Sequence, residues 1–118
     1  MIRACLFALV ALALPAQAQQ VVNAPAAEIR VLDKITGNLR DVEIPERGEA
    51  RIGLLNIQLS ECRYPAGNPA GNAYAMLTIF YRGLPDPVFE GWMIASSPAL
   101  NALDHPRYDV WVLRCKTS

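Results

Sequence analysis

The chain has 118 residues with eleven basic and eleven acidic side chains, so its formal net charge is zero. This length suits one domain with its own core. Positive and negative residues are interspersed along the chain, without a basic stripe or polybasic run, so the sequence predicts neither nucleic acid nor an anionic membrane surface as a partner.

Residues 1–18 read as a cleaved signal peptide. Arg3 supplies a positive start, Ala4–Leu14 an apolar run, and Ala16-Gln17-Ala18 an A-x-A cleavage site. The apolar run is about half of the roughly twenty residues that span a bilayer. We therefore expect export with cleavage after Ala18 and no transmembrane segment after cleavage.

The mature chain is expected to hold a disordered leader over 19–27 and one domain over 28–117. Alternating residues predict strands at 28–32 and 40–45, joined at the turn signal Gly37-Asn38. Pro45 closes the second strand or marks it as an edge strand. Further strands are predicted over 50–55 and 56–63.

The second half continues this pattern. Residues 64–72 carry Pro-Ala-Gly-Asn twice and predict a loop, and 73–82 is the longest predicted strand. Trp92–Ala95 and Tyr108–Cys115 predict two more strands, the last one central in its sheet. Ser97-Pro98 between them is typical of a helix N-cap and first helical position. Six to seven strands with one short helix predict an all-β sandwich or small barrel.

Cys62 and Cys115 remain after cleavage, because Cys5 lies in the signal peptide. In an oxidising compartment they predict one intramolecular disulfide. A metal site would need further ligands, and only His105 offers nitrogen, so no metal or other cofactor is expected. Strict alternation places Cys62 on the polar face of its strand. The disulfide then lies outside, or a bulge near Glu61 turns the cysteine inward, which we favour.

Aromatic residues on strands supply a candidate platform for a peptide or carbohydrate: Trp92, Trp111, Tyr74, Tyr81 and Tyr108. Trp111 alternates in phase with Leu113 and is expected in the core. The segment 96–108 is irregular, as binding loops on rigid scaffolds often are. Its candidate contact surface consists of Trp92, Ser96, Ser97, Asp104, His105, Arg107 and Tyr108. A purely structural clasp over the sandwich remains an equal alternative.

A hydrolase would need a base within reach of a nucleophile, for which His105 and Ser97 are the candidates. Ser97 already has a role as a cap, and no G-x-S-x-G motif is present. A carboxylate pair of Asp104 and Asp109 would need a sugar cleft, for which the domain is small. The sequence therefore indicates a protein that is not an enzyme.

Two motifs resemble those of the DUF2155 family. These are Gly91-Trp92-Met93-Ile94-Ala95-Ser96-Ser97-Pro98-Ala99-Leu100 with Asp104-His105-Pro106 and Tyr108–Cys115, and Val31-Leu32-Asp33-Lys34-Ile35-Thr36-Gly37. The chain departs from the family pattern at Ile94, usually phenylalanine, and at Asp104, usually glutamate. The resemblance implies a small exported protein and supplies no catalytic or binding residue.

Together these features predict a periplasmic, non-catalytic module that binds a periplasmic or envelope protein. One alternative is a small cell-wall or peptide hydrolase that uses the Asp104–Asp109 region. The other is a structural subunit of an envelope assembly, in which Arg40–Pro45 would pair with a partner strand.

Overall fold

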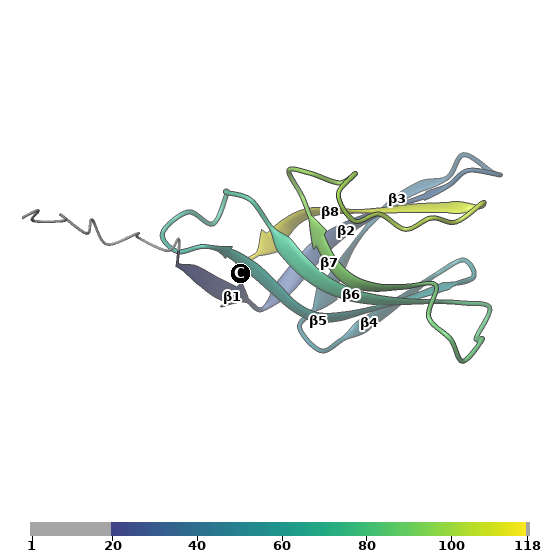
Figure 1. Ribbon diagram of the computed structural model, residues 1–118, viewed down its shortest axis with the longest axis horizontal. Coiled ribbons are helices and arrows are strands. Elements are labelled where there is room, and N and C mark those ends of the chain that lie inside the picture. The colour runs from purple at the N-terminus through teal and green to yellow at the C-terminus, as the bar shows by residue number, and fades with distance from the viewer. Residues whose placement is uncertain (1–19, 118) are drawn as a thin grey trace, which may run out of the picture.

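The computed structural model describes residues 20–117 as two antiparallel sheets packed face to face (Figure 1). The strands are β1 (Val21–Ala24), β2 (Ala26–Asp33), β3 (Leu39–Pro45), β4 (Glu49–Ile52), β5 (Leu55–Pro65), β6 (Tyr74–Tyr81), β7 (Phe89–Ile94) and β8 (Tyr108–Lys116). The predicted signal peptide lies outside the described residues. The predicted all-β sandwich is confirmed, with eight strands instead of six to seven and no closure into a barrel.

The five-stranded sheet is built around β5. Along one edge of β5, β4 pairs with its first half and β1 with its last residues. Along the other edge, β5 pairs with β6. β7 then pairs with β6 and forms the far edge. The smaller sheet has the order β3-β2-β8, which makes β3 an edge strand, one of the two options that Pro45 left open.

The sandwich has two distinct ends (Figure 1). The β2–β3, β4–β5 and β6–β7 turns and the start of β8 lie together at the end that we call the turn end. A hydrogen bond links the two sheets there, from the Leu54 N–H to the Tyr108 hydroxyl at 3.1 Å. The disulfide end lies opposite, where β5 and β8 finish.

The leader expected over 19–27 is ordered over the part that the structure describes. Residues 21–24 form β1, and the chain passes at Pro25 from the five-stranded sheet into β2 of the other. Ala24, Ala26 and Ala27 are all buried, and Ala24 lies beside Cys62 while Ala27 lies beside Cys115. The composition of residues 19–27 predicted disorder. In the structure, the small side chains of the three alanines let the two sheets approach closely around the disulfide.

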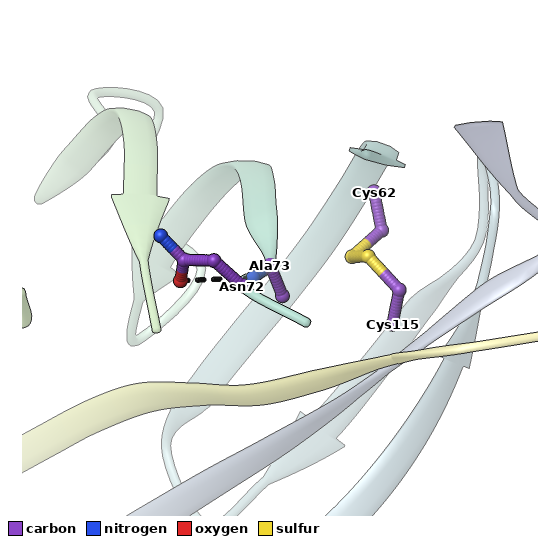
Figure 2. Close-up of a disulfide and its surroundings, with 4 residues drawn as sticks. All are labelled: Cys62, Asn72, Ala73 and Cys115. Atoms are coloured by element: carbon purple, nitrogen blue, oxygen red, sulfur yellow. Dashed lines mark hydrogen bonds between the residues drawn. A yellow bond between two sulfur atoms is a disulfide. The ribbon is translucent and has the colours of Figure 1, made fainter. Parts of the chain in front are cut away.

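Two β-bulges turn both cysteines into the core. The register of β5 against β6 shifts between Leu59 and Glu61, and that of β8 against β2 shifts at the Glu28/Ile29 step. Each shift changes which face the following residues occupy. Cys62 is fully buried and Cys115 is 4% exposed, and their disulfide joins the sheets (Figure 2). The bulge predicted near Glu61 is confirmed.

The bulge in β8 was not predicted, and two expectations about the rest of this strand were wrong. Tyr108, Val110 and Val112 point into the core, so Trp111 lies half-buried on the outer face of the three-stranded sheet. β8 is also an edge strand, where a central position was predicted from its apolar residues on both faces. Outward Trp111 lies opposite Arg30 of β2, whose aliphatic stem suits an aromatic neighbour.

The short helix predicted after Ser97-Pro98 is absent, and none occurs elsewhere between residues 20 and 117. A single turn forms instead, closed by the Leu100 N–H donating to the Ser97 carbonyl at 3.1 Å. Leu103 is buried in the core, 6% exposed. Because isolated helical turns are marginal, the burial of Leu103 outweighs the weak helical preference of this segment. Across residues 20–117 we find no helix long and apolar enough to cross a membrane.

The core comes from the alternating residues that predicted the strands. Ile57 of β5 and Ile79 of β6 are cross-strand neighbours, and both are fully buried. Ile29 of β2 and Ile44 of β3 are equally buried from the other sheet. Burial of one such side chain contributes about 1.5–3 kcal/mol, so this layer holds both sheets in fixed register.

Candidate functional site

The outer face of the five-stranded sheet carries an aromatic and apolar cluster, which we call the aromatic face. Its members are Val21, Arg63, Tyr74, Met76 and Trp92. Met76 and Trp92 are direct cross-strand neighbours, as are Arg63 and Tyr74. The residues between them on β6, such as Ala75 and Leu77, are fully buried, so the alternation of β6 places Tyr74 and Met76 outward.

Arg63 and Trp92 form the centre of this face. The guanidinium carbon of Arg63 lies 4.9 Å from the Trp92 ring centroid, a cation–π distance. Glu61 forms an ion pair with Arg63 and thereby fixes the guanidinium beside the ring. Val21, Arg63, Tyr74 and Trp92 line a shallow hollow of about 220 Å³. The hollow therefore offers an aromatic wall together with a held cation.

Two asparagines hold the strands that carry this face. The Asn72 side-chain oxygen accepts from the Ala73 and Ser96 N–H groups, both at 3.0 Å, while its nitrogen donates to the Tyr74 hydroxyl at 3.3 Å. Figure 2 shows Asn72 with its bond to Ala73. Asn101 donates to the Trp92 carbonyl at 2.9 Å. These bonds fix Tyr74 and Trp92 through backbone and side chain alike.

The connecting loop, residues 95–107 between β7 and β8, is mostly exposed but buries two side chains, Leu103 and His105. His105 is 9% exposed, and its ring lies 4.5 Å from the Tyr81 ring and 5.7 Å from the Tyr108 ring, centroid to centroid. Its Nδ1 accepts from the Arg107 and Tyr108 N–H groups at 3.0 and 3.2 Å. Burial lowers the pKa of His105, and the charges of Lys34 and Arg107 lower it further. The histidine is therefore a neutral acceptor within a turn.

The β2–β3 turn is tied to the same loop. Arg107 donates to both carboxylate oxygens of Asp33, with the shortest contact at 3.0 Å. That guanidinium, helped by the Ile35 and Thr36 N–H groups, holds the pKa of Asp33 at about 2. Lys34 donates to the His105 carbonyl at 2.7 Å. The motif over 31–37 thus meets the 104–108 part of the other motif at the turn end, and Asp33 and Arg107 are 74 positions apart in the chain.

The seven residues of the predicted contact surface are divided by the structure. Trp92 lies on the aromatic face, while Ser96, Ser97 and Asp104 lie along the connecting loop, Ser96 and Asp104 exposed. Tyr108 is 1% exposed and His105 is buried, so both belong to the core. Arg107 pairs with Asp33. Leu103, His105 and Arg107 join the loop to the sandwich, while the exposed part of the loop leaves the predicted contact surface a prediction.

Sequence reasoning missed most of the aromatic face. Tyr74 and Trp92 were in the predicted platform, but Tyr108 is buried in the core with half-buried Tyr81 edge-on against it, and Trp111 lies on the opposite outer face. Val21 was assigned to a disordered leader, and Arg63 was not singled out. The available signal was the alternation of β6, in which Met76 and Tyr74 share one face.

The residues considered for hydrolysis have other partners in the structure. The Nδ1 of His105 already accepts two backbone hydrogen bonds, and Asp109 lies 3.5 Å from the Lys34 amine. The Ser97 N–H donates to the Ile94 carbonyl within a turn. Over residues 20–117 no three His, Cys, Asp or Glu side chains gather as metal ligands.

Comparison with known proteins finds one family. The model of a family described as "Uncharacterized protein conserved in bacteria (DUF2155)" matches residues 27–115. The chain is also similar to "Uncharacterized protein RP359" of Rickettsia prowazekii (strain Madrid E), with 29% identity over 96 residues. The match covers 79% of this chain and 62% of that relative, so the chain spans less than two thirds of its length. No solved structure matches.

Proposed function

We propose the following role for this chain, which belongs to the DUF2155 family: it is an exported, non-catalytic module that binds a periplasmic or envelope protein. The observation that carries the proposal is the aromatic face. A half-buried tryptophan with a cation fixed beside it, around a hollow, has the composition of an interaction hot spot. Trp and Arg are the residues most enriched at such positions.

The pattern of the first 18 residues and the disulfide support an exported location. A cross-link between buried cysteines suits a compartment in which thiols are oxidised. The two outer faces differ in composition. On the opposite face the ion pairs Arg30–Asp41, at 2.8 Å, and Arg114–Glu28, at 3.3 Å, link neighbouring strands, whereas the aromatic face combines the Glu61–Arg63 pair with Tyr74, Met76 and Trp92.

The two alternatives carry less support. A hydrolase in the Asp104–Asp109 region would need His105 as a free base, whereas its Nδ1 is engaged within a turn. A structural subunit would use the free edge of β3, and that strand does lie at an edge. Charged side chains at Arg40, Asp41 and Glu43 and the proline at its end are devices that discourage strand addition.

The test compares Trp92→Ser with Trp111→Ser. Both tryptophans are half-buried on outer sheet faces, one on each sheet, which makes the second variant a matched control. Tagged protein is cross-linked in the envelope of its source cell, and captured proteins are quantified by mass spectrometry. Trp92→Ser should reduce a stoichiometric partner at least about tenfold, as hot-spot truncation does, while Trp111→Ser retains it.

An equal loss in both variants would place the partner elsewhere and reject the aromatic face. Recovery of the protein from the cytoplasm with residues 1–18 attached would reject export. If no partner is enriched with wild-type protein, the binding role itself fails. Urea denaturation of both variants shows whether a loss reflects a damaged fold.

A further inference from the structure

Exposed apolar side chains are concentrated at the turn end of the sandwich. Eight large apolar side chains are exposed among the described residues, and five of them lie in or beside the turns at this end. These five are Ile35 (72% exposed), Leu39 (55%), Leu54 (39%), Leu84 (55%) and Val88 (37%). Single exposed apolar residues are ordinary, but a cluster of them marks an interaction site.

Basic side chains lie between these apolar tips. Arg40, Arg51 and Arg82 are exposed at the turn end, and within 20–117 none of the three takes part in an ion pair. Arg82 packs over the Tyr81 ring at 5.1 Å. Of the acidic residues in the same turns, Asp33 is neutralised by Arg107 and Asp86 remains. The sequence shows no polybasic run because the fold collects these arginines from three separate segments.

A groove joins the two features. It has a volume of about 700 Å³ and lies between the β4–β5 and β6–β7 turns, where Arg51, Leu54, Arg82 and Leu84 line it. Glu49 also lines the groove, and its carboxylate accepts from the Asn56 amide at 3.2 Å. The groove thus presents two cations and two apolar side chains, which match an anionic group attached to a hydrocarbon chain.

We propose that the turn end docks on an anionic phospholipid membrane. Ile35, Leu54 and Leu84 would enter the boundary between headgroups and acyl chains, as apolar faces of interfacial proteins do. Arg40, Arg51 and Arg82 would bind lipid phosphates through charge-assisted hydrogen bonds. Separate apolar tips with cations between them suit a fluid bilayer, whereas a protein partner would require a matched rigid surface.

This site is distinct from the aromatic face. Tyr74 begins β6 at the disulfide end, whereas the β6–β7 turn, which carries Leu84, follows the last residue of β6, Tyr81, at the turn end. A protein docked on a membrane in this way would keep the hollow beside Trp92 open to a partner. The two proposals can therefore fail separately.

The first experiment is flotation with vesicles of the chain that remains after the predicted cleavage, residues 19–118. Vesicles of phosphatidylglycerol and phosphatidylethanolamine are compared with vesicles of phosphatidylcholine. Wild-type protein should float with the anionic vesicles only. Each arginine lost from Arg51→Gln or Arg82→Gln should weaken binding about fivefold, and Ile35→Ser with Leu84→Ser should weaken it at least as much.

Matched controls come from the rest of the fold. Leu100→Ser changes a side chain that is 75% exposed but lies in the connecting loop, which leaves β7 at the disulfide end. Arg47→Gln changes an exposed arginine in the β3–β4 turn, also at that end. Both should float like wild-type protein. Equal weakening by Leu100→Ser, or equal flotation of all variants, would overturn the proposal.

A second measurement does not depend on whether the variants fold equally well. Benzoylphenylalanine in place of Leu84 should give lipid adducts on irradiation with phosphatidylglycerol vesicles, detected by mass spectrometry. The same group in place of Leu100 should give none. Lipid adducts from both positions would show that contact with lipid is not specific to the turn end. In whole envelopes, adducts of position 84 with protein alone would show that the turn end contacts a protein instead. Either result would overturn the proposal.

Discussion

At the scale of single residues, His105 was a candidate functional residue, and the structure gives it a structural role instead. His105 combines the chemistry of a general base with a place among polar residues, and both properties suggested a site. In the structure its ring packs between Tyr81 and Tyr108, and Nδ1 closes a turn. A residue type that serves catalysis at an exposed position serves here as a buried hydrogen-bond acceptor.

The neutral state of His105 makes stability depend on pH. The pKa of His105 is lowered from 6.5 in the folded protein, so the unfolded chain binds a proton first as the pH falls. The free energy of unfolding should be constant above pH 6.5 and decrease below it, by at most about 1.4 kcal/mol per pH unit for one proton. Urea denaturation between pH 7.5 and 5.5 measures this slope.

His105→Asn is the matched variant for that slope. The asparagine oxygen can accept the same backbone hydrogens but does not titrate, so the slope should vanish. The chain has one histidine, and the pKa of Asp33 lies below this pH range both at its ordinary value of 3.8 and at about 2 in the folded protein, so neither group contributes to the slope in the variant. A slope that persists in His105→Asn would contradict the assignment.

At the scale of secondary structure, strand alternation predicted most elements and the change of face in β5, but not the change of face in β8. The β2–β3 hairpin follows from Gly37-Asn38, and Gly37 adopts the left-handed conformation with φ of 76°. The bulge in β8 has no such marker, because Leu113 is as suitable for either face as Val112. The edge position of β8 could not be predicted either. Apolar residues on both faces of a strand are typical of a central strand, but they also occur when one face is half-exposed.

The aromatic face was difficult to predict for a related reason. Its residues come from β1, β5, β6 and β7, so their proximity depends on strand order. Arg63 can be recognised as part of this face only from its contact with Trp92, which lies 29 positions further along the chain. The two tryptophans look equivalent in the sequence, and only the register against Met76 and Arg30 separates their surroundings.

The connecting loop protects the free edge of β7. Asn101 binds the Trp92 carbonyl at 2.9 Å and packs against Gly91, where an added Cβ would lie 2.8 Å from the asparagine nitrogen. Asn101→Ala should lower the free energy of unfolding by about 1 kcal/mol through loss of that hydrogen bond. Urea denaturation measures the change. Leu100→Ala, at the neighbouring exposed position, should be neutral, and an equal cost in both would count against an edge-protecting bond.

At the scale of the whole molecule, the two ends of the sandwich close by different means. The disulfide end closes around small residues, with Ala24, Ala27 and Ala75 paired beside the two cysteines. The turn end closes with aromatic rings and two ion pairs, Arg107 with Asp33 and Lys34 with Asp109. One end is therefore fixed covalently, and the other by interactions that pH and salt can change.

The disulfide should supply a large part of the total stability. Its cysteines are 53 positions apart, and the chain-entropy estimate for such a loop is about 4 kcal/mol. The double variant Cys62→Ala with Cys115→Ala should lower the free energy of unfolding by that order in urea denaturation. Wild-type protein under reducing conditions is the internal comparison. A difference below about 1 kcal/mol would show that packing alone holds the sheets together.

The inward-turned cysteines also set an order of events during maturation. Cys62 is fully buried and Cys115 nearly so once the sheets have packed. A soluble oxidant or an oxidoreductase must reach a thiolate to form the bond. The cross-link is therefore made while β5 and β8 are still accessible, before the alanine-lined end closes, and afterwards the fold itself shields it from exchange. Whether a newly made chain acquires the disulfide therefore depends on when its cysteines are oxidised, as well as on the stability of the bond.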